Sequence, residues 1–377
     1  MNSRERVQIA LSFEQPDRTP VFASFVPEIE QRLRRQFSIS ELDTGAALGN
    51  DMVKSCAGLE MSFNGKPEPE YTDVWGIRWR YIKNNSGLYT EIAEHPLAGD
   101  LDKLDSFEIP DPCEESQYDD FCRKKELYGH EKWMIGSSQI SIFEACWYLR
   151  GLHAFLTDMV LRPGYAELLM DKVMQFPLKA ARKYIELDAD MIWFGDDVAM
   201  QTGMMISLDM WRKFFKGRYA QLFAECRKAN PRIKIAYHSC GQCTDILDDM
   251  IEIGLDVLNP LQPMAMDPFE TKRRYGKRLA LFGGLCIQNT LPYGSAGDVQ
   301  KAVNELIIEL GKGGGYILAP AHHIQADTSV ENIRSFYESA IKTASHARQR
   351  VAVPDGTKYL KQELLTKGLP KNGEASI

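Results

Sequence analysis

The sequence predicts a single α/β domain built as a closed (β/α)8 barrel, with an irregular elaboration near the amino terminus. From Met134 onward, short apolar segments alternate with helical patterns, and serial β-α units form parallel sheets with right-handed crossovers. Nearly every apolar segment ends in polar residues, as expected where a ligand site lies at the carboxyl ends of barrel strands. No G-x-G-x-x-G turn follows the first strand candidate, which argues against an open dinucleotide-binding sheet.

The strand and helix candidates follow one another along the chain. Ser3–Phe13 is expected to form a short amphipathic helix, Thr19–Phe25 the first buried strand and Glu28–Phe37 a second helix. Six further strand candidates are Met134–Gln139, Asp190–Asp197, Ile233–Tyr237, Asp256–Pro260, Leu279–Cys286 and Gly315–His323. Helical patterns cover Ile142–Leu149 and Ser207–Ala229. One strand not identified earlier in the chain would bring the total to eight.

Residues 45–126 are less regular and are interpreted as an insertion in the barrel domain, with a separate small lobe as the alternative. Tyr71–Tyr81 alternates in polarity and predicts a strand that pairs with Gly87–Ile92 in a hairpin. Leu101–Tyr118 is acidic and contains prolines, so we expect it at the surface. The barrel domain is predicted to span residues 1–353, and the polar residues 354–377 are predicted to form a frayed tail.

The composition is ordinary for a soluble globular protein. The 377 residues are 44% hydrophobic and 26% charged, with a net charge of −7. No basic stripe points to nucleic acid, and no apolar run is long enough to span a membrane. The amino terminus M-N-S-R-E-R-V has no secretory core, which favours a cytoplasmic protein. Most of the eight cysteines are therefore expected to be buried thiols rather than disulfides.

The segment I-K-I-A-Y-H-S-C-G, from Ile233 to Gly241, carries the strongest functional signal. Residues two apart in an extended segment point to the same side, so His238 and Cys240 could bind one metal ion. An imidazole and a thiolate are the ligands that zinc prefers. Alternatively, His238 contacts substrate and Cys240 is a packed thiol. Cys243 forms a C-x2-C spacing with Cys240, but it is expected in a helical turn that could face away.

Polar residues at the other strand ends complete the candidate site. They are Asp196, Asp197, Asn259, Gln262, Cys286, Gln288, His322 and His323. Either Cys286 or His322 could be a further metal ligand, the alternatives being a buried thiol and a substrate contact. Only one of His322 and His323 can point into the mouth, because adjacent strand residues face opposite sides. Asn259, Gln262, Gln288 and His323 are interpreted as substrate-binding residues.

Asp196 and Asp197 form a pair of adjacent carboxylates, followed by Gln201. If both carboxylates are buried, the pKa of at least one should be raised, which suits a proton donor. Alternatively, one of them orients a loop or a ligand histidine. Glu144 lies in an otherwise apolar helix and is either a fourth ligand or, as we prefer, a partner of Arg150.

Several segments together resemble one family. They are E-R-V-Q-I-A-L-S-F-E-Q-P-D-R-T-P-V, G-D-D-V-A-M-Q-T-G-M-M-I-S-L-D-M-W-R-K-F-F-K-G-R-Y, Y-H-S-C-G, G-G-L-C-I-Q and I-L-A-P-A-H-H-I-Q. From Arg4 to about Ala344, the chain resembles the uroporphyrinogen decarboxylase superfamily. The resemblance implies a (β/α)8 barrel, in agreement with the pattern of strands and helices.

The resemblance favours the cobalamin-dependent methyltransferases of that superfamily. These have an H-x-C pair and a later cysteine that bind zinc, and His238 and Cys240 match the pair. Ala321-His322-His323 stands where the later cysteine of thiol-methylating members is expected, which argues against thiol methylation. True decarboxylases carry R-Q-A-G-R-Y after the first strand, whereas this chain has S-F-V-P-E-I-E with Glu28 and Glu30. That departure argues against a substrate with many carboxylates.

The resemblance therefore implies a zinc-dependent methyltransferase that works with a separate corrinoid-binding protein. The methyl donor would be a small methyl ether, methylamine or methanol-like compound. Asp196, Asp197 and Gln201 would be the catalytic side chains. The alternatives are a metal-free lyase resembling uroporphyrinogen decarboxylase, and a relative that binds a ligand without turnover. A homodimer is compatible with this interpretation.

Overall fold

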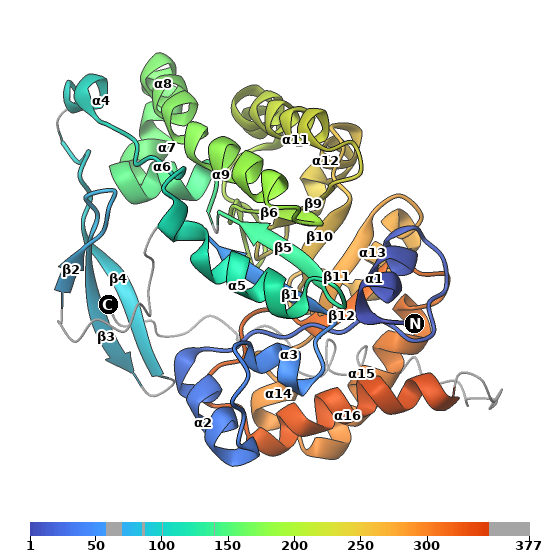
Figure 1. The fold of residues 1–377 in the computed structure, drawn as a ribbon. Helices are drawn as coiled ribbons and strands as arrows, with labels where there is room; N and C mark the ends of the chain where they lie inside the picture. Colours follow the sequence, from blue (N-terminus) through green and yellow to red (C-terminus); the bar gives the residue numbers. More distant parts are fainter. Residues whose placement is uncertain (58–69, 85–86, 100, 139, 347–377) are drawn as a thin grey trace, which may run out of the picture.

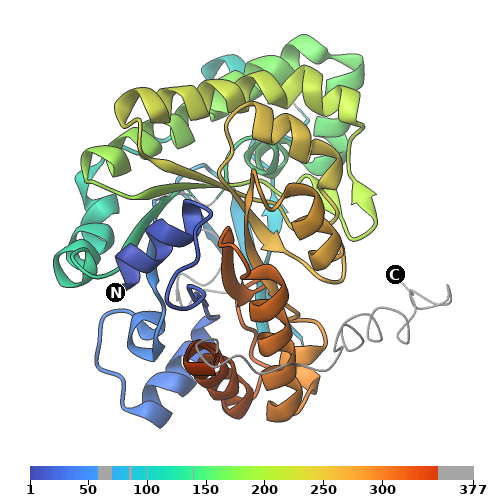
Figure 2. The ribbon, with the colours of Figure 1, turned by 90° about the vertical axis from the view of Figure 1, so that its right-hand side faces the viewer.

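The computed structural model describes residues 1–57, 70–84, 87–99, 101–138 and 140–346. Its core is a curled sheet of seven parallel strands in the order β1-β5-β6-β9-β10-β11-β12. The strands are β1 (Met52–Cys56), β5 (Trp133–Ser137), β6 (Met191–Gly195), β9 (Lys234–His238), β10 (Val257–Leu261), β11 (Ala280–Leu285) and β12 (Tyr316–Pro320). Helices surround the sheet (Figures 1 and 2). The six strands predicted from residue 134 onward are confirmed.

The helices connect and cover these strands. They are α1 (Ser3–Leu11), α2 (Pro27–Phe37), α3 (Thr44–Leu48), α4 (Lys103–Ser106), η1 (Glu115–Tyr118), α5 (Asp119–Tyr128), α6 (Phe143–Arg150), α7 (Leu152–Leu161), α8 (Pro163–Val173), α9 (Gln175–Glu186), α10 (Leu208–Trp211), η2 (Arg212–Lys216), α11 (Gly217–Ala229), η3 (Thr244–Ile246), α12 (Leu247–Glu252), α13 (Pro268–Tyr275), α14 (Thr290–Tyr293), α15 (Ala296–Leu310) and α16 (Val330–His346). The helix predicted at Ser207–Ala229 is thus α10, a π-helical stretch and α11. Among the described residues, no helix combines the length and apolar character that a membrane span needs.

The strands are buried on both faces, as expected for a parallel sheet covered by helices. Alternate residues of each strand point to the concave side of the sheet and fill it. The buried cluster there includes Met52, Ile135, Met191, Trp193, Ala236, Val257, Ala280, Phe282, Ile317 and Ala319. Phe282 packs edge-on against both Phe22 and Trp193, with ring centroids 5.5 Å apart in each pair. The centre of the sheet is therefore a packed core rather than a pore.

The segment predicted as the first strand lies beside β12 without forming a regular strand. It makes single bridges from Val21 to Leu318 and from Phe25 to Ile324. On its other side, the Asn50 side chain accepts the amide of Ala23 and donates to the Ala23 carbonyl, both at 2.8 Å. Because a side chain takes the place of a backbone ladder, the structure shows a curled seven-stranded sheet where the sequence predicts a closed eight-stranded barrel.

The region predicted as an insertion contains one strand of the main sheet. β1 lies within residues 45–126 and pairs in parallel with β5, so the insertion is shorter than predicted. The predicted pairing with Gly87–Ile92 is confirmed, but Tyr71–Tyr81 forms parts of two strands instead of one. β2 (Glu70–Thr72), β3 (Arg78–Asn84) and β4 (Gly87–Glu94) make a three-stranded antiparallel sheet. This sheet lies at one side of the molecule (Figure 1), where Trp75 contacts Phe176 and Trp79 contacts Tyr148. The predicted tail at 354–377 lies outside the described residues.

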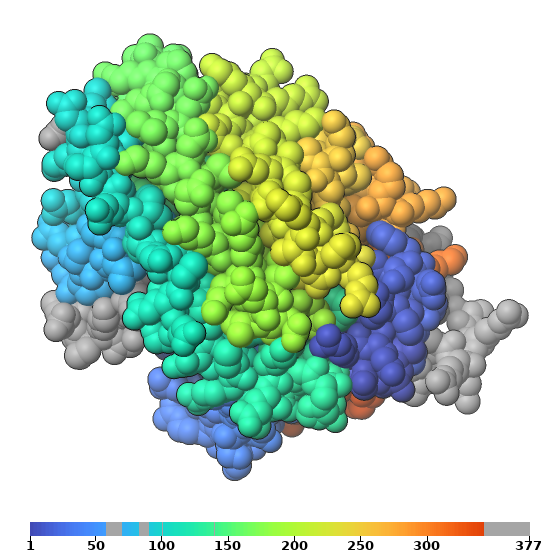
Figure 3. Space-filling model, turned by 45° about the horizontal axis from the view of Figure 1, so that its top comes forward, coloured from blue at the N-terminus to red at the C-terminus, as the bar shows by residue number. Residues whose placement is uncertain are grey.

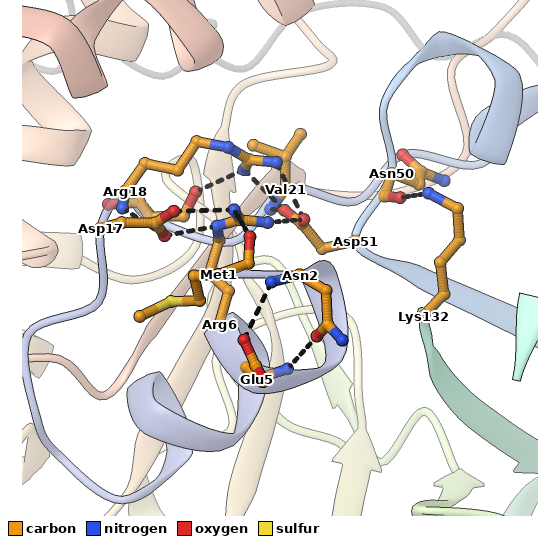
Figure 4. A network of polar contacts seen from close by, with 11 residues as sticks. Met1, Asn2, Glu5, Arg6, Asp17, Arg18, Val21, Asn50, Asp51 and Lys132 are labelled. Carbon is orange, nitrogen blue, oxygen red and sulfur yellow. Dashed lines mark hydrogen bonds and ion pairs between the residues drawn. The ribbon is translucent and has the colours of Figure 1, made fainter. Parts of the chain in front are cut away.

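A buried ion-pair network fixes the amino-terminal segment to the start of β1 (Figure 4). Asp51 is completely buried and accepts hydrogen bonds from Arg6 Nη1 and Arg18 Nη1, both at 2.6 Å. It also accepts the Val21 amide at 2.8 Å. Arg6 in turn donates to Asp17 at 2.7 Å. Every oxygen of the buried carboxylate therefore has a partner, which a buried charge requires.

Replacing Asp51 by alanine should destabilise the fold strongly. The change leaves two guanidinium groups without their buried partner, so we expect a loss of about 3 to 5 kcal/mol in the free energy of unfolding. Glu338→Ala is the matched control, because Glu338 forms only half-exposed pairs with Lys342 and Arg334 and should cost about 1 kcal/mol or less. Urea unfolding followed by circular dichroism measures both changes, and equal losses would contradict the expectation.

Candidate metal and substrate site

The polar residues predicted at the strand ends gather at one edge of the sheet. Asp197 follows β6, His238 ends β9, Asn259 lies in β10, and His322 follows β12. The strands are parallel neighbours, so their carboxyl ends meet on the same side, the usual ligand side of such a sheet.

His238, Cys240 and His322 form a compact group of metal-binding atoms. The Nε2 atom of His238 lies 3.6 Å from Sγ of Cys240. One donor atom from each of the three residues lies within 4.8 Å of the other two. All three side chains are partly buried. The structure thus brings together three of the four residues predicted as metal ligands.

Hydrogen bonds from the neighbouring strands orient His238. Asn259 Nδ2 donates to the carbonyl of Phe282 at 3.3 Å, which leaves Asn259 Oδ1 facing His238 Nδ1 at 2.6 Å. An amide oxygen only accepts, so Nδ1 carries the proton and Nε2 keeps a free lone pair toward Cys240. A partner on the second ring nitrogen is the usual support for a ligand histidine.

Burial controls the protonation states of the three residues. It lowers the pKa of His238, and burial together with the neighbouring His238 imidazole lowers the pKa of His322 to about 4. Both imidazoles are therefore neutral at pH 7, the form that binds metal. Burial and the nearby Asp197 carboxylate raise the pKa of the Cys240 thiol above its usual range. Without a cation beside it, this thiol keeps its proton.

The two adjacent aspartates have different roles, because only Asp197 faces the site. Its Oδ1 lies 3.7 Å from His238 Nε2 and accepts the Cys240 amide at 2.7 Å. Asp196 is completely buried behind the strand. Its carboxylate accepts the amides of Ile142, Phe143 and Glu144 at the start of α6, and the Tyr219 hydroxyl. Burial raises the pKa of Asp196 to about 6. This geometry favours a positioning role for Asp196 over the predicted catalytic role.

Glu144 supports the loop after β6 rather than filling either predicted role. Its Oε2 accepts the Asp197 amide at 3.0 Å and its Oε1 accepts the Tyr148 hydroxyl at 3.2 Å. It is not part of the compact group of metal-binding atoms. Arg150 instead pairs with Asp158 at 2.8 Å. Burial, with the charges of Asp197 and Asp196, raises the pKa of Glu144 well above its usual value.

Three glutamines form a chain of amides beside Cys240. Gln262 Oε1 accepts the Gly241 amide at 2.8 Å, and Gln262 Nε2 faces Oε1 of Gln201 at 3.5 Å and of Gln288 at 3.4 Å. Gln201 lies in the turn between β7 (Ala199–Met200) and β8 (Gly203–Met204). Gly241 has φ +85°, and a Cβ there would lie 2.5 Å from the Met200 carbonyl oxygen. Glycine at 241 therefore lets this hairpin pack against the segment after β9.

Two predicted or considered sulfur ligands lie outside the compact group. Cys286 is buried and follows Gly283, where a Cβ would lie 2.7 Å from the Leu261 amide nitrogen. The close backbone contact expected at these glycines is therefore present, but it does not bring the sulfur to His238. Cys243 is also buried, with its Sγ 4.0 Å from the Ser239 carbonyl. His323 contacts His322, with ring centroids 5.0 Å apart, and its side chain is exposed.

Lys54 lies close to this group of residues and is not among the residues predicted from the sequence. The Trp193 ring stacks against His238, with centroids 5.8 Å apart and an angle of 28° between the rings. The Lys54 ammonium lies 4.3 Å from the Trp193 ring centroid. Lys54 belongs to β1, the strand that was not identified. No sequence signal marks Lys54, because the lysine and serine of M-V-K-S-C do not follow the pattern of a buried strand.

A groove of about 610 Å³ opens at the opposite ends of the strands. It lies between α1 and the starts of β5, β6 and β9; the space-filling view shows the amino-terminal residues, in blue, against this part of the chain (Figure 3). Arg4 pairs with Asp190 and Lys125 with Asp188, so charges there compensate one another. The amino ends of barrel strands commonly serve stability, and we assign the groove no part in the site.

The fold and the site define an α/β enzyme with its ligand site at the carboxyl ends of parallel strands. The chain belongs to the uroporphyrinogen decarboxylase (URO-D) family, whose profile matches residues 82–343. A uroporphyrinogen decarboxylase of Hamiltonella defensa is 26% identical over 275 residues, covering 67% of this chain and 72% of the relative. One of Shewanella loihica is 24% identical over 276 residues, covering 67% and 73%.

The fold is also similar to a solved structure described as a methyltransferase from Methanosarcina mazei. The match covers 91% of this chain and 99% of that chain, with a TM-score of 0.68 and 18% sequence identity. This likeness extends the shared architecture to regions outside the family profile.

Asp196→Ala and Asp197→Ala should differ in their effect on stability, because Asp196 holds the start of α6 and Asp197 faces the site. Asp196→Ala leaves three buried amides and a buried hydroxyl without an acceptor, so we expect a loss of at least about 2 to 3 kcal/mol in the free energy of unfolding. Asp197→Ala should cost about 1 kcal/mol or less, because water can reach its position. Urea unfolding of both variants measures the difference. An Asp196→Ala protein as stable as the wild type would refute the positioning role.

Proposed function

We propose that this protein is a zinc-dependent methyltransferase that moves a methyl group between a small donor and a corrinoid carried by a partner protein. The observation that carries the proposal is the compact group of His238, Cys240 and His322. It lies at the ligand end of a sheet whose fold resembles a methyltransferase structure.

The spacing of the metal-binding atoms of His238 and Cys240 fits zinc. A tetrahedral zinc ion with ordinary Zn–N and Zn–S bonds separates a nitrogen from a sulfur ligand by about 3.6 Å. The separation of His238 Nε2 and Cys240 Sγ is 3.6 Å. Three protein ligands leave a fourth position for substrate, as in catalytic zinc sites. When bound, zinc would act as a Lewis acid on the heteroatom that carries the methyl group.

The surrounding residues would orient the metal-binding side chains and the substrate. Asn259 holds the imidazole of His238 in the tautomer whose Nε2 can bind metal. Asp197 holds the backbone of Cys240 and would orient the donor or supply a proton to the leaving heteroatom. Gln201, Gln262 and Gln288 would contact the substrate from the side of the β7–β8 hairpin. His323 is exposed beside His322 and is proposed as a further substrate contact.

Exposed apolar side chains near the site are compatible with a protein partner. Met200 in the β7–β8 hairpin is 56% exposed, and Tyr293 at the end of α14 is 74% exposed. Large exposed apolar residues are common where another protein docks. A corrinoid protein would have to approach the carboxyl ends of the strands, where the hairpin lies.

The second candidate function is a metal-free decarboxylation, favoured by the names of the two curated relatives. In this chain only Asp197 could stabilise a protonated pyrrole, since Asp196 is occupied by α6. The segment after the first strand offers no arginine for several carboxylates. Glu30 there pairs with Arg34 at 3.2 Å and accepts the Thr44 hydroxyl at 2.7 Å. We therefore prefer the methyltransferase.

The zinc content of purified variants should identify the ligands. We expect about one zinc per wild-type chain. The His238→Ala, Cys240→Ala double variant should contain almost none, because it lacks two of the three proposed zinc ligands. His322→Ala should lower the zinc affinity at least about tenfold. Cys286→Ala is the control and should keep its zinc. Elemental analysis measures all four proteins. Loss of zinc in Cys286→Ala but not in His322→Ala would contradict the proposed ligand set.

Chelation should separate the two candidate functions. The transfer of a methyl group to free cob(I)alamin, followed by the change in cobalamin absorbance, should stop when zinc is removed and return when zinc is added back. We expect this for a donor that the wild-type enzyme accepts. Release of carbon dioxide from uroporphyrinogen that persists after chelation would instead establish the decarboxylase.

A further inference from the structure

We propose that Lys54 binds an anionic group of the methyl donor, so that the donor is a small acid with one carboxylate or a comparable anion. The identification of this acid as a methyl donor rests on the proposed function. The anion site itself rests on the position of Lys54 and on its lack of a partner.

Lys54 extends from β1 toward the concave side of the sheet. Met52, two residues earlier on the same face, belongs to the cluster that fills this side. The Lys54 ammonium lies 4.3 Å from the Trp193 ring centroid, and the ring stacks on His238 at 5.8 Å. The ammonium is therefore no farther from the His238 ring than these two distances together. A small molecule could contact Lys54 and the metal-binding group at the same time.

The ammonium of Lys54 has no anionic partner among the residues that the structure describes. Its ammonium lies against the face of the Trp193 ring, a favourable but partial replacement for hydration. Neighbouring lysines differ in this respect. Lys124 Nζ pairs with Asp120 at 2.9 Å, and Lys125 Nζ pairs with Asp188 at 2.8 Å. A partly buried cation without a partner is costly, and an incoming anion would supply the missing charge-assisted hydrogen bond.

Lys54 would distinguish among the methyl donors that the group of His238, Cys240 and His322 alone would accept. A methylammonium ion would be repelled by Lys54, and methanol would be too small to reach it from the metal-binding group. A single lysine, with Glu28 and Glu30 in α2 in place of arginines, suits one anionic group rather than several. The methyl-bearing heteroatom would lie at His238 and Cys240, and the anion at Lys54. Lys54 contributes binding and takes no part in the transfer of the methyl group.

Calorimetric binding of matched acids and amides tests the proposal without any corrinoid. The probes are two pairs, methoxyacetate with methoxyacetamide and 3-methoxybenzoate with 3-methoxybenzamide. The pairs differ in length, so that they sample a short and a long separation between Lys54 and the metal-binding group. The zinc-loaded wild-type chain should bind at least one acid about tenfold or more tightly than its amide, because only the acid forms a charge-assisted contact. Lys54→Met should abolish this preference without weakening the binding of the amide. Lys54→Arg should retain most of it.

Lys125→Met serves as the control, since Lys125 pairs with Asp188 beside the groove at the opposite ends of the strands; its binding should equal that of the wild type. The zinc content and melting temperature of each variant establish that the site and the fold are intact. Equal binding of acid and amide by the wild type would overturn the proposal, as would failure of both acids to bind. So would a Lys54→Met protein that keeps the preference and loses only turnover. A failed zinc or methyl-transfer assay would instead count against the proposed function.

Discussion

The buried carboxylate of Asp196 is the interaction on which the site depends. Asp196 directly follows β6, accepts the first amides of α6, and accepts a hydroxyl from α11. One residue later the alternation of the strand turns Asp197 to the opposite side, toward His238. The same connection brings Glu144, at the start of α6, to the amide of Asp197. Asp196, which faces away from the site, thus fixes the position of Asp197, which would contact the ligand.

A second constraint crosses three neighbouring strands. The carbonyl of Phe282 in β11 holds the amide of Asn259 in β10, which in turn holds the imidazole of His238 in β9. The tautomer of the metal-binding histidine is therefore set by the register of the sheet. Because each strand is packed on both faces, the strands resist sliding, and the free lone pair of Nε2 keeps its direction without help from a flexible loop.

Much of this arrangement could be predicted from the sequence, because alternating apolar segments and helical patterns mark the six strands from β5 onward. The positions of His238, Cys240 and His322 follow from strands that all end at one edge. The missing strand could not be recognised, since M-V-K-S-C carries a lysine and a serine whose environments arise only in the fold. Nor does sequence show that Asn50 replaces a backbone ladder, or that α6 begins against Asp196. Cys286 was a reasonable ligand by position, but the backbone path after Gly283 leaves its sulfur outside the group.

The charges of the site support the proposal that zinc and an anionic methyl donor bind there together. Burial lowers the pKa of both imidazoles, which favours their neutral form, and raises the pKa of Glu144 well above its usual value. A zinc ion with the thiolate of Cys240 would carry one net positive charge, which Asp197 would balance. Lys54 then remains a partly buried cation with no anionic partner among the residues that the structure describes. Low-dielectric surroundings favour paired charges, so a monoanionic methyl donor would supply the partner that Lys54 lacks, whereas a neutral or cationic donor would not.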